Sequence, residues 1–266
     1  MGSHLNNLAG VLRDQGDLVG ARTLLERALV IDDSAYGPAH PHVGTDLINL
    51  ALVLRDLGEL RSARSLLERA LAIHESAYGP DDPAVGSGLS NLGLVLRGLG
   101  DLAGARTLLE RALSIADSAY GSDHPEFSRN LNNLALVLKD LGDLGGARTL
   151  LRRALAITES AYGSDHPEVG KNLNNLATVL QDLGDLAGAR RLLGRALAIA
   201  EAAYGPGHPE VGEDLNNLAA VLRDLGDVAG ARLLFDRALA IAESAHGSDD
   251  PTTQAIRRNL GSLPPE

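Results

Sequence analysis

Residues 131–172 read LNNLALVLKDLGDLGGARTLLRRALAITESAYGSDHPEVGKN, and residues 173–214 read LNNLATVLQDLGDLAGARRLLGRALAIAEAAYGPGHPEVGED. The second stretch repeats the first, and the same 42-residue spacing holds without insertion or deletion from Leu5 to Ile256. Six copies result, and they begin at Leu5, Leu47, Leu89, Leu131, Leu173 and Leu215. A fixed period between about 20 and 50 residues predicts a solenoid, in which each unit buries its apolar face only against its neighbours.

Each copy carries the pattern of two helices. In the second copy the first helix runs from Pro41 to about Leu57, with Leu47, Leu50 and Leu54 along one stripe. Proline suits the first turn of a helix because its missing N–H would be unpaired there. The prolines recur as Pro41, Pro83, Pro125, Pro167, Pro209 and Pro251.

Glycine separates the two helices and ends the second one. Gly58 suits the left-handed conformation that follows a helix. One residue later an acidic side chain stands where it caps the second helix, as Asp17, Glu59, Asp101, Asp143, Asp185 and Asp227. The second helix then extends from Leu60 to Gly79. A connection of about two residues makes the helices antiparallel, and Ala63 lets them approach closely.

The composition excludes several classes of function. The 266 residues carry a net charge of −11, which opposes binding to nucleic acid. Cysteine is absent, so disulfides, thiolate metal sites and cysteine nucleophiles are excluded. No stretch approaches the roughly 18 consecutive apolar residues that a membrane span needs. A chain without cysteine fits a reducing cytoplasm, and we expect a cytoplasmic protein that binds neither nucleic acid nor membranes.

The repeat resembles the tetratricopeptide repeat. The resemblance rests on the Leu50-Ala51 pair, the turn glycine Gly58, the small residue Ala63 of the second helix and the Ala-Leu pair at residues 70–71. The usual period of that family is about 34 residues, and the longer unit resembles the kinesin light chain type, which is also seen beside bacterial signalling ATPase domains. The resemblance implies an all-α fold, a right-handed solenoid of antiparallel helix pairs with a concave groove.

The two ends differ from the interior copies. Residues 1–4 resemble a vector remnant, and the first copy lacks the first turns of its first helix, as if cut from a longer chain. Residues 257–266 end a seventh copy of the repeat that contains only a shortened first helix, and we expect them to act as a polar cap. The repeats between them are residues 5–46, 47–88, 89–130, 131–172, 173–214 and 215–256.

The sequence contains no known catalytic motif, so we expect that the protein is not an enzyme and binds no cofactor. Ser122-Asp123-His124 and Ser164-Asp165-His166 are adjacent in sequence, whereas a catalytic triad converges from separate segments. The one histidine per repeat does not predict a metal site either, because equivalent atoms of stacked helices lie on the order of 10 Å apart. A short polar group before each proline is the simpler interpretation.

Asparagine recurs inside the first helix of every copy, although it is a poor helix former. The resemblance places these residues in the concave groove, where side-chain amides can bind the backbone of an extended peptide. An equally weighted alternative is that the amides bond neighbouring helices. The candidate binding asparagines are Asn49, Asn91, Asn132, Asn133, Asn174, Asn175, Asn216 and Asn217, in a series that also includes Asn6, Asn7 and Asn259.

Basic residues follow on the same helices and form a second candidate feature. They are Arg55, Arg97 and Lys139 near the helix end, with Arg129 and Lys171 near the start. As a positive strip they would suit acidic peptide side chains or a C-terminal carboxylate. The slightly preferred alternative is that a cation near a helix C-terminus complements the helix dipole and the aspartate that follows it.

The second helix carries arginines and a terminal tyrosine, for which we expect structural roles. The arginines should pair with Glu26, Glu68 and Glu110. The tyrosines should pack between repeats with the hydroxyl outward, and they are Tyr36, Tyr78, Tyr120, Tyr162 and Tyr204.

These features together predict a scaffold for protein–protein interaction that binds an extended or helical peptide in the groove. Two alternatives stay open. In the first, the array would be a sensor or assembly arm of a larger signalling ATPase. In the second, it would associate end to end through Leu5, Leu8 and Leu12 of the N-terminal face.

Overall fold

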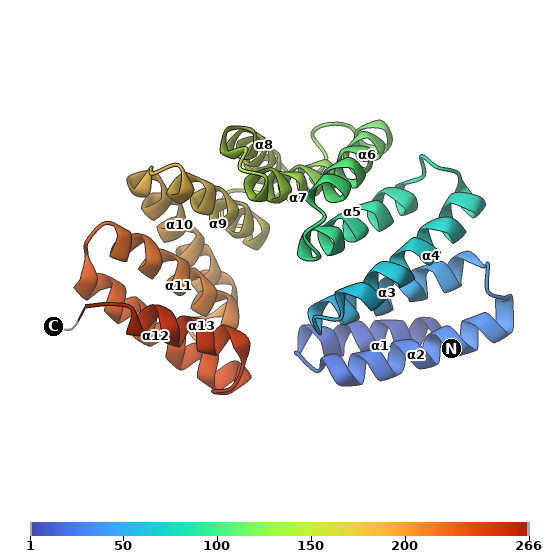
Figure 1. Ribbon diagram of the computed structural model, residues 1–266, viewed down its shortest axis with the longest axis horizontal. Coiled ribbons are helices and arrows are strands. Elements are labelled where there is room, and N and C mark those ends of the chain that lie inside the picture. The colour runs from blue at the N-terminus through green and yellow to red at the C-terminus, as the bar shows by residue number, and fades with distance from the viewer. Residues whose placement is uncertain (1, 265–266) are drawn as a thin grey trace. The chain divides into compact units, whose positions relative to one another are not determined.

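The computed structural model describes residues 2–264, which fold into thirteen α-helices and contain no strand (Figure 1). The first helix of each hairpin is α1 (Gly2–Asp14), α3 (Pro41–Asp56), α5 (Pro83–Gly98), α7 (Pro125–Asp140), α9 (Pro167–Asp182), α11 (Pro209–Asp224) or α13 (Pro251–Gly261). The second helix is α2 (Leu18–Tyr36), α4 (Leu60–Tyr78), α6 (Leu102–Tyr120), α8 (Leu144–Tyr162), α10 (Leu186–Tyr204) or α12 (Val228–His246).

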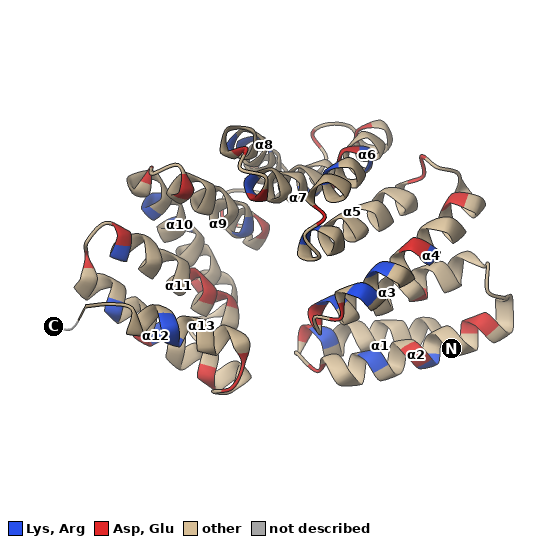
Figure 2. Ribbon diagram, viewed as in Figure 1, with Lys and Arg blue, Asp and Glu red and all other residues tan. Residues whose placement is uncertain are grey.

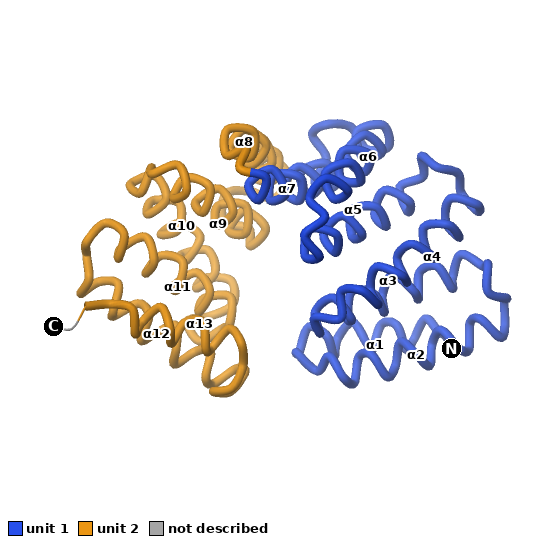
Figure 3. Tube along the Cα trace, viewed as in Figure 1, with its two compact units in different colours: residues 1–141 blue, residues 142–266 orange. Residues whose placement is uncertain are grey.

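The helices form two compact units, residues 1–141 and 142–266 (Figure 3). In the first unit α1 packs on α2, α3 on α4 and α5 on α6, and each of α3, α5 and α7 also packs on the second helix that precedes it. The second unit repeats this arrangement from α8 to α13. The predicted all-α solenoid of antiparallel helix pairs is confirmed. None of the described helices combines the length and apolar character needed to cross a membrane.

The ends of the chain continue the helical pattern. Residues 2–4, which resemble a vector remnant, form the first turn of α1, while Met1 lies outside the described residues. The residues predicted to cap the array, 257–266, begin within α13, which extends from Pro251 to Gly261. Pro265 and Glu266 lie outside the described residues.

Small residues lie where the two helices of a hairpin meet. Ala63 and its equivalents are completely buried, as the sequence predicts for a close approach, and they are Ala21, Ala63, Ala105, Ala147, Ala189 and Ala231. One turn later a leucine is buried in each hairpin, as at Leu67, with Phe235 in its place in α12. Full burial of such a side chain contributes about 1.5–3 kcal/mol.

The side chain before each proline caps the first helix. His124 Nδ1 accepts a hydrogen bond from the backbone N–H of Glu126 at 3.1 Å, and Asp82 Oδ1 accepts one from Ala84 at 2.8 Å. Histidine and aspartate are interchangeable here because each offers an acceptor to an otherwise unpaired N–H. The interpretation that a short polar group before proline is sufficient is therefore confirmed.

The cap of the second helix depends on a glycine that the sequence analysis missed. Asp101 Oδ1 accepts a hydrogen bond from the backbone N–H of Gly104 at 2.9 Å. A Cβ atom at Gly104 would lie only 2.6 Å from Asp101 Oδ2. In α4 the equivalent residue is Ser62, and Glu59 makes no capping bond. The predicted cap at Glu59 is wrong, and Glu59 instead accepts a hydrogen bond from Arg22 Nη1 at 2.9 Å.

The terminal tyrosines of the second helices are 41–56% exposed, so the prediction that they pack between repeats is wrong. Tyr120 stacks on His124 with ring centroids 4.7 Å apart, and Tyr36, Tyr162 and Tyr204 stack in the same way on the histidine four residues later. The pairing of helix arginines with glutamates is confirmed, since Arg64 Nε lies 2.7 Å from Glu68 Oε1.

Replacing Asp101 with alanine tests the capping geometry. We expect the free energy of unfolding to fall by about 1 kcal/mol, because the N–H of Gly104 loses its acceptor. Glu59→Ala is the matched control, and we expect it to cost at most a few tenths of a kcal/mol because it breaks only an exposed ion pair. Urea unfolding followed by circular dichroism measures both, and equal losses would contradict the assignment.

Candidate functional site

A row of asparagines follows the first helices, one per helix, and we call these residues the ladder asparagines. Asn7 is exposed, and the remaining members are half-buried. They are Asn7, Asn49, Asn91 and Asn133 in the first unit, and Asn175, Asn217 and Asn259 in the second. The residue immediately before each ladder asparagine is here called the flanking residue.

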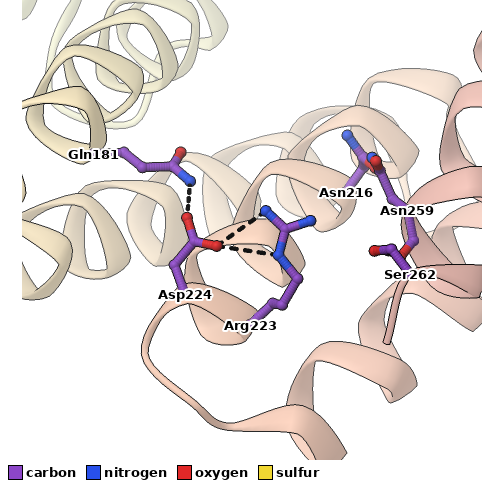
Figure 4. A network of polar contacts seen from close by, with 6 residues as sticks. All are labelled: Gln181, Asn216, Arg223, Asp224, Asn259 and Ser262. Atoms are coloured by element: carbon purple, nitrogen blue, oxygen red, sulfur yellow. Dashed lines mark hydrogen bonds and ion pairs between the residues drawn. The ribbon is translucent and has the colours of Figure 1, made fainter. Parts of the chain in front are cut away.

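Some ladder asparagines bond to the flanking residue of the preceding first helix. In the first unit Asn133 Nδ2 donates to Ser90 Oγ at 3.0 Å, which joins α7 to α5. In the second unit Asn259 Nδ2 donates to Asn216 Oδ1 at 3.0 Å, which joins α13 to α11 (Figure 4). Asn133 and Asn216 therefore serve the packing of neighbouring helices.

Two flanking asparagines bond to buried aspartates of the next first helix. Asn6 Nδ2 donates to Asp46 Oδ1 and Asn174 Nδ2 donates to Asp214 Oδ1, each at 2.5 Å. Asp46 is 1% exposed and Asp214 is 4% exposed. The sequence analysis missed these carboxylates, although Asp46 lies four residues before the buried Leu50 and so falls on the apolar stripe.

Three half-buried ladder asparagines make no side-chain hydrogen bond in the part of the chain that the structure describes: Asn49, Asn91 and Asn217. The flanking residues of the preceding first helices, Asn6 and Asn174, donate Nδ2 to aspartate, and their Oδ1 atoms are buried without a hydrogen-bond partner. For Asn91, the flanking residue of the preceding first helix is Ile48, whose side chain has no hydrogen-bond acceptor.

Asn132 and Asn175 are half-buried and also have partners. Of the predicted binding asparagines, the structure therefore leaves Asn49, Asn91 and Asn217 with unused amides.

The candidate basic residues of the first unit engage acidic side chains. Arg97 Nε lies 2.5 Å from Asp140 Oδ2, on the next first helix. Arg55 instead pairs with Asp56 at 2.9 Å, because the equivalent of Asp140 in α5 is Gly98. Acidic and basic residues are accordingly interspersed over the helices (Figure 2).

Near the helix starts Arg129 pairs with Glu126, and Lys171 Nζ lies 2.8 Å from Glu168 Oε1. Lys139 also has a partner. These pairs neutralise most of the predicted positive strip, and each exposed pair contributes only about 0–1 kcal/mol.

In the second unit, the bond between the ends of two successive first helices is made by an amide and not by a cation. Gln181 Nε2 donates to Asp224 Oδ2 at 2.6 Å, and the same carboxylate accepts hydrogen bonds from Arg223 (Figure 4). The aspartate at the end of a first helix is therefore a shared acceptor, which receives bonds from its own helix and from the preceding first helix.

Burial raises the pKa of the two aspartates that the flanking asparagines contact. The pKa of Asp214 rises from 3.8 to about 6, mainly because of burial and also because Glu210 and Glu213 lie nearby, while the bond from Asn174 opposes the shift. The pKa of Asp46 is also raised, first by burial and then by Asp32. The Oδ2 atom of Asp46 has no hydrogen-bond partner.

Neither of the Ser-Asp-His segments has the arrangement of a triad. Ser164 Oγ bonds to the adjacent Asp165 at 3.1 Å, and His166 Nδ1 accepts the capping bond from Glu168 at 3.2 Å. Within residues 2–264 no group of three histidine, aspartate or glutamate side chains is placed to hold a metal ion.

Comparison with protein families gives a consistent result over most of the chain. The model of the tetratricopeptide repeat family matches residues 1–76, 45–118, 85–160, 126–202 and 168–244. None of the curated proteins matches the sequence.

Solved structures with the same architecture include the nearly identical TPR-like repeats of a Podosopora anserina protein described as a kinesin light chain. That structure is 25% identical, has a TM-score of 0.62, and the match covers 78% of this chain and 98% of that one. BtubC (BKLC) from P. vanneervenii is 22% identical with a TM-score of 0.64, and covers 96% and 93%. PilF of Pseudomonas aeruginosa is 19% identical with a TM-score of 0.56, and covers 97% of each chain. The last two similarities show the fold alone.

Asp214→Asn tests the cost of the buried carboxylate. The folded state holds the Asp214 proton more tightly than the unfolded state, so wild-type stability falls as the pH rises from about 4 through about 6. We expect the variant to be more stable than wild type at pH 8, by on the order of 1–3 kcal/mol, and to lose this advantage near pH 4.

Urea unfolding at both pH values measures the difference. Asp165→Asn, which removes the same charge from an exposed turn, is the control. A stability difference for Asp214→Asn that does not depend on pH would contradict the assignment.

Proposed function

The chain belongs to the tetratricopeptide repeat family, and we propose that it binds an extended peptide segment of a partner protein along the ladder asparagines. The family assignment confirms the resemblance predicted from the sequence, including the kinesin light chain type of repeat. At the level of the family the protein is a scaffold for protein–protein interaction. The peptide mode of binding and the residues that carry it are the proposal.

The observation that supports the proposal most is the pair of unused amides in the first unit. Asn49 on α3 and Asn91 on α5 are half-buried without a hydrogen bond, and these two helices pack against each other. The amide atoms of both side chains are not among the buried polar atoms that lack a partner, so they stay accessible to a ligand. A peptide backbone offers the matching N–H and C=O groups whatever its side chains are.

The charges favour a ligand recognised through its backbone and apolar groups. Arg55 and Arg97 are paired with Asp56 and Asp140, so an acidic ligand would have to displace those carboxylates. Each amide–backbone hydrogen bond contributes about 0.5–1.5 kcal/mol net. A few of them, together with apolar contact, give an affinity in the micromolar range, near −8 kcal/mol.

The double variant Asn49→Ala, Asn91→Ala tests the proposal. We expect it to lose about tenfold or more in affinity for peptides selected from a random display library on the wild-type protein, while its melting temperature stays nearly unchanged. Fluorescence polarisation with the labelled peptides measures the affinity.

Asn133→Ala is the matched control, since Asn133 is a ladder asparagine whose amide is already bonded to Ser90. We expect this variant to lower the melting temperature and to keep more of the peptide affinity. A large stability loss in the Asn49→Ala, Asn91→Ala variant, or unchanged peptide affinity, would support a packing role for the ladder and reject the proposal.

A second candidate function is self-association through α1. Of the three leucines predicted for this contact, Leu8 is 50% exposed, while Leu5 and Leu12 are half-buried. Val11 on the same helix is 51% exposed, whereas Leu50 and Val53, the equivalents of Leu8 and Val11 in α3, are 5% and 1% exposed. The exposed face is therefore suited to a second copy of the chain.

Leu8→Lys tests the association. Light scattering over a range of concentrations should show a dimer for the wild-type protein and a monomer for the variant, because the lysine places a charge in the apolar contact. A wild-type protein that stays monomeric at high concentration would reject this function and leave the peptide-binding proposal unaffected.

A further inference from the structure

A cavity of about 390 Å³ opens beside the ladder asparagines of the first unit. Its polar rim includes Asn7 and Asn49, and its apolar wall includes Val11, Leu52 and Val53. Gly10 forms part of the lining, and a Cβ atom at Gly10 would have no heavy atom within 4 Å. The cavity therefore lies where the side chain of residue 10 would be.

The following copies of the repeat show what fills this position elsewhere in the chain. The residues equivalent to Gly10 in α3, α5 and α7 are Leu52, Leu94 and Leu136, and each of them is partly buried. Glycine in the middle of α1 also lowers the helix propensity. In α9 and α11 the equivalent residues are the smaller Thr178 and Ala220, so Gly10 is the one member of the series over α1 to α11 that has no side chain.

The charges at the rim do not select a charged occupant. Arg13 lines the cavity, but its Nε atom lies 2.6 Å from Asp56 Oδ2. Asp14 also belongs to the lining, so a positive and a negative group lie together at the rim. An apolar group that contacts Val11, Leu52 and Val53 gains free energy of burial without displacing an ion pair.

We propose that this cavity receives an aliphatic side chain, leucine or isoleucine, from the partner segment that the ladder binds. The inference rests on the proposed function and deepens it, because it names an anchor residue of the ligand and its place. Asn7 and Asn49 lie on the rim, where they can bond the ligand backbone on either side of the anchor. The anchor takes the position that Leu52 takes one repeat later.

Small probes test the cavity without a known partner. N-acetyl-leucine N-methylamide should cause saturable shifts in the NMR signals of the Gly10, Val11 and Leu52 amides of the wild-type protein, and N-acetyl-glycine N-methylamide should not. The same shifts should persist in Gly10→Ala, which raises helix propensity but leaves most of the cavity open, and disappear in Gly10→Leu, which fills it. Equal responses to the two probes, or unchanged shifts in Gly10→Leu, would overturn the inference.

Peptide selection separates this inference from the proposed function. Peptides selected on the wild-type protein should share a leucine or isoleucine and should bind Gly10→Leu about tenfold or more weakly, while Gly10→Ala binds them nearly as well as wild type. Peptides that depend on Asn49 and Asn91 but bind Gly10→Leu unchanged would uphold the proposed function and reject the aliphatic anchor. If no peptides are selected, the proposed function fails, and the result with the leucine probe still decides whether the cavity accepts the side chain.

Discussion

A single hairpin of this protein cannot cover its own apolar surface. The first helices α3, α5, α9 and α11 each pack against their partner helix and against the second helix of the preceding hairpin. Completely buried alanines let the two helices of a hairpin lie close together, and a leucine one turn later is buried beside them. The fold therefore exists only as a stack, and the spacing of the sequence fixes which residues meet across each interface.

That constraint determines the chemistry of the exposed face of the first helices. Two ladder asparagines, Asn133 and Asn259, bond to the flanking residue of the preceding first helix in their unit. Where that residue is serine or a free asparagine oxygen, the amide is used in packing. Where it is isoleucine, as at Ile48, it offers no acceptor. Where it is an asparagine that donates to a buried aspartate, as at Asn6, no bond to the ladder asparagine forms.

Much of the fold could be predicted from the sequence because the residues that begin and end helices recur in six copies of the repeat. The prolines at the helix starts and the glycines between helices lie where they are expected, and Gly58 has a φ of +80°. The predictions that were wrong concern side-chain interactions that depend on the identity of a single neighbouring residue. Glu59 does not cap α4, where glutamate replaces the capping aspartate and Ser62 replaces the glycine three residues later. The site was less predictable. Asn133, whose side chain is hydrogen-bonded, and Asn91, whose side chain is not, occupy the same position of the repeat.

The dependence of a ladder asparagine on a residue in another helix has an evolutionary consequence. Duplication produces copies with the same recognition group, and they would otherwise diverge only through changes at the group itself. Here the difference between Ile48 and Ser90 decides whether the next ladder asparagine finds an acceptor on the preceding first helix, while the asparagine itself is unchanged. Under the proposed function, single substitutions at flanking positions would therefore change which amides are available to a peptide.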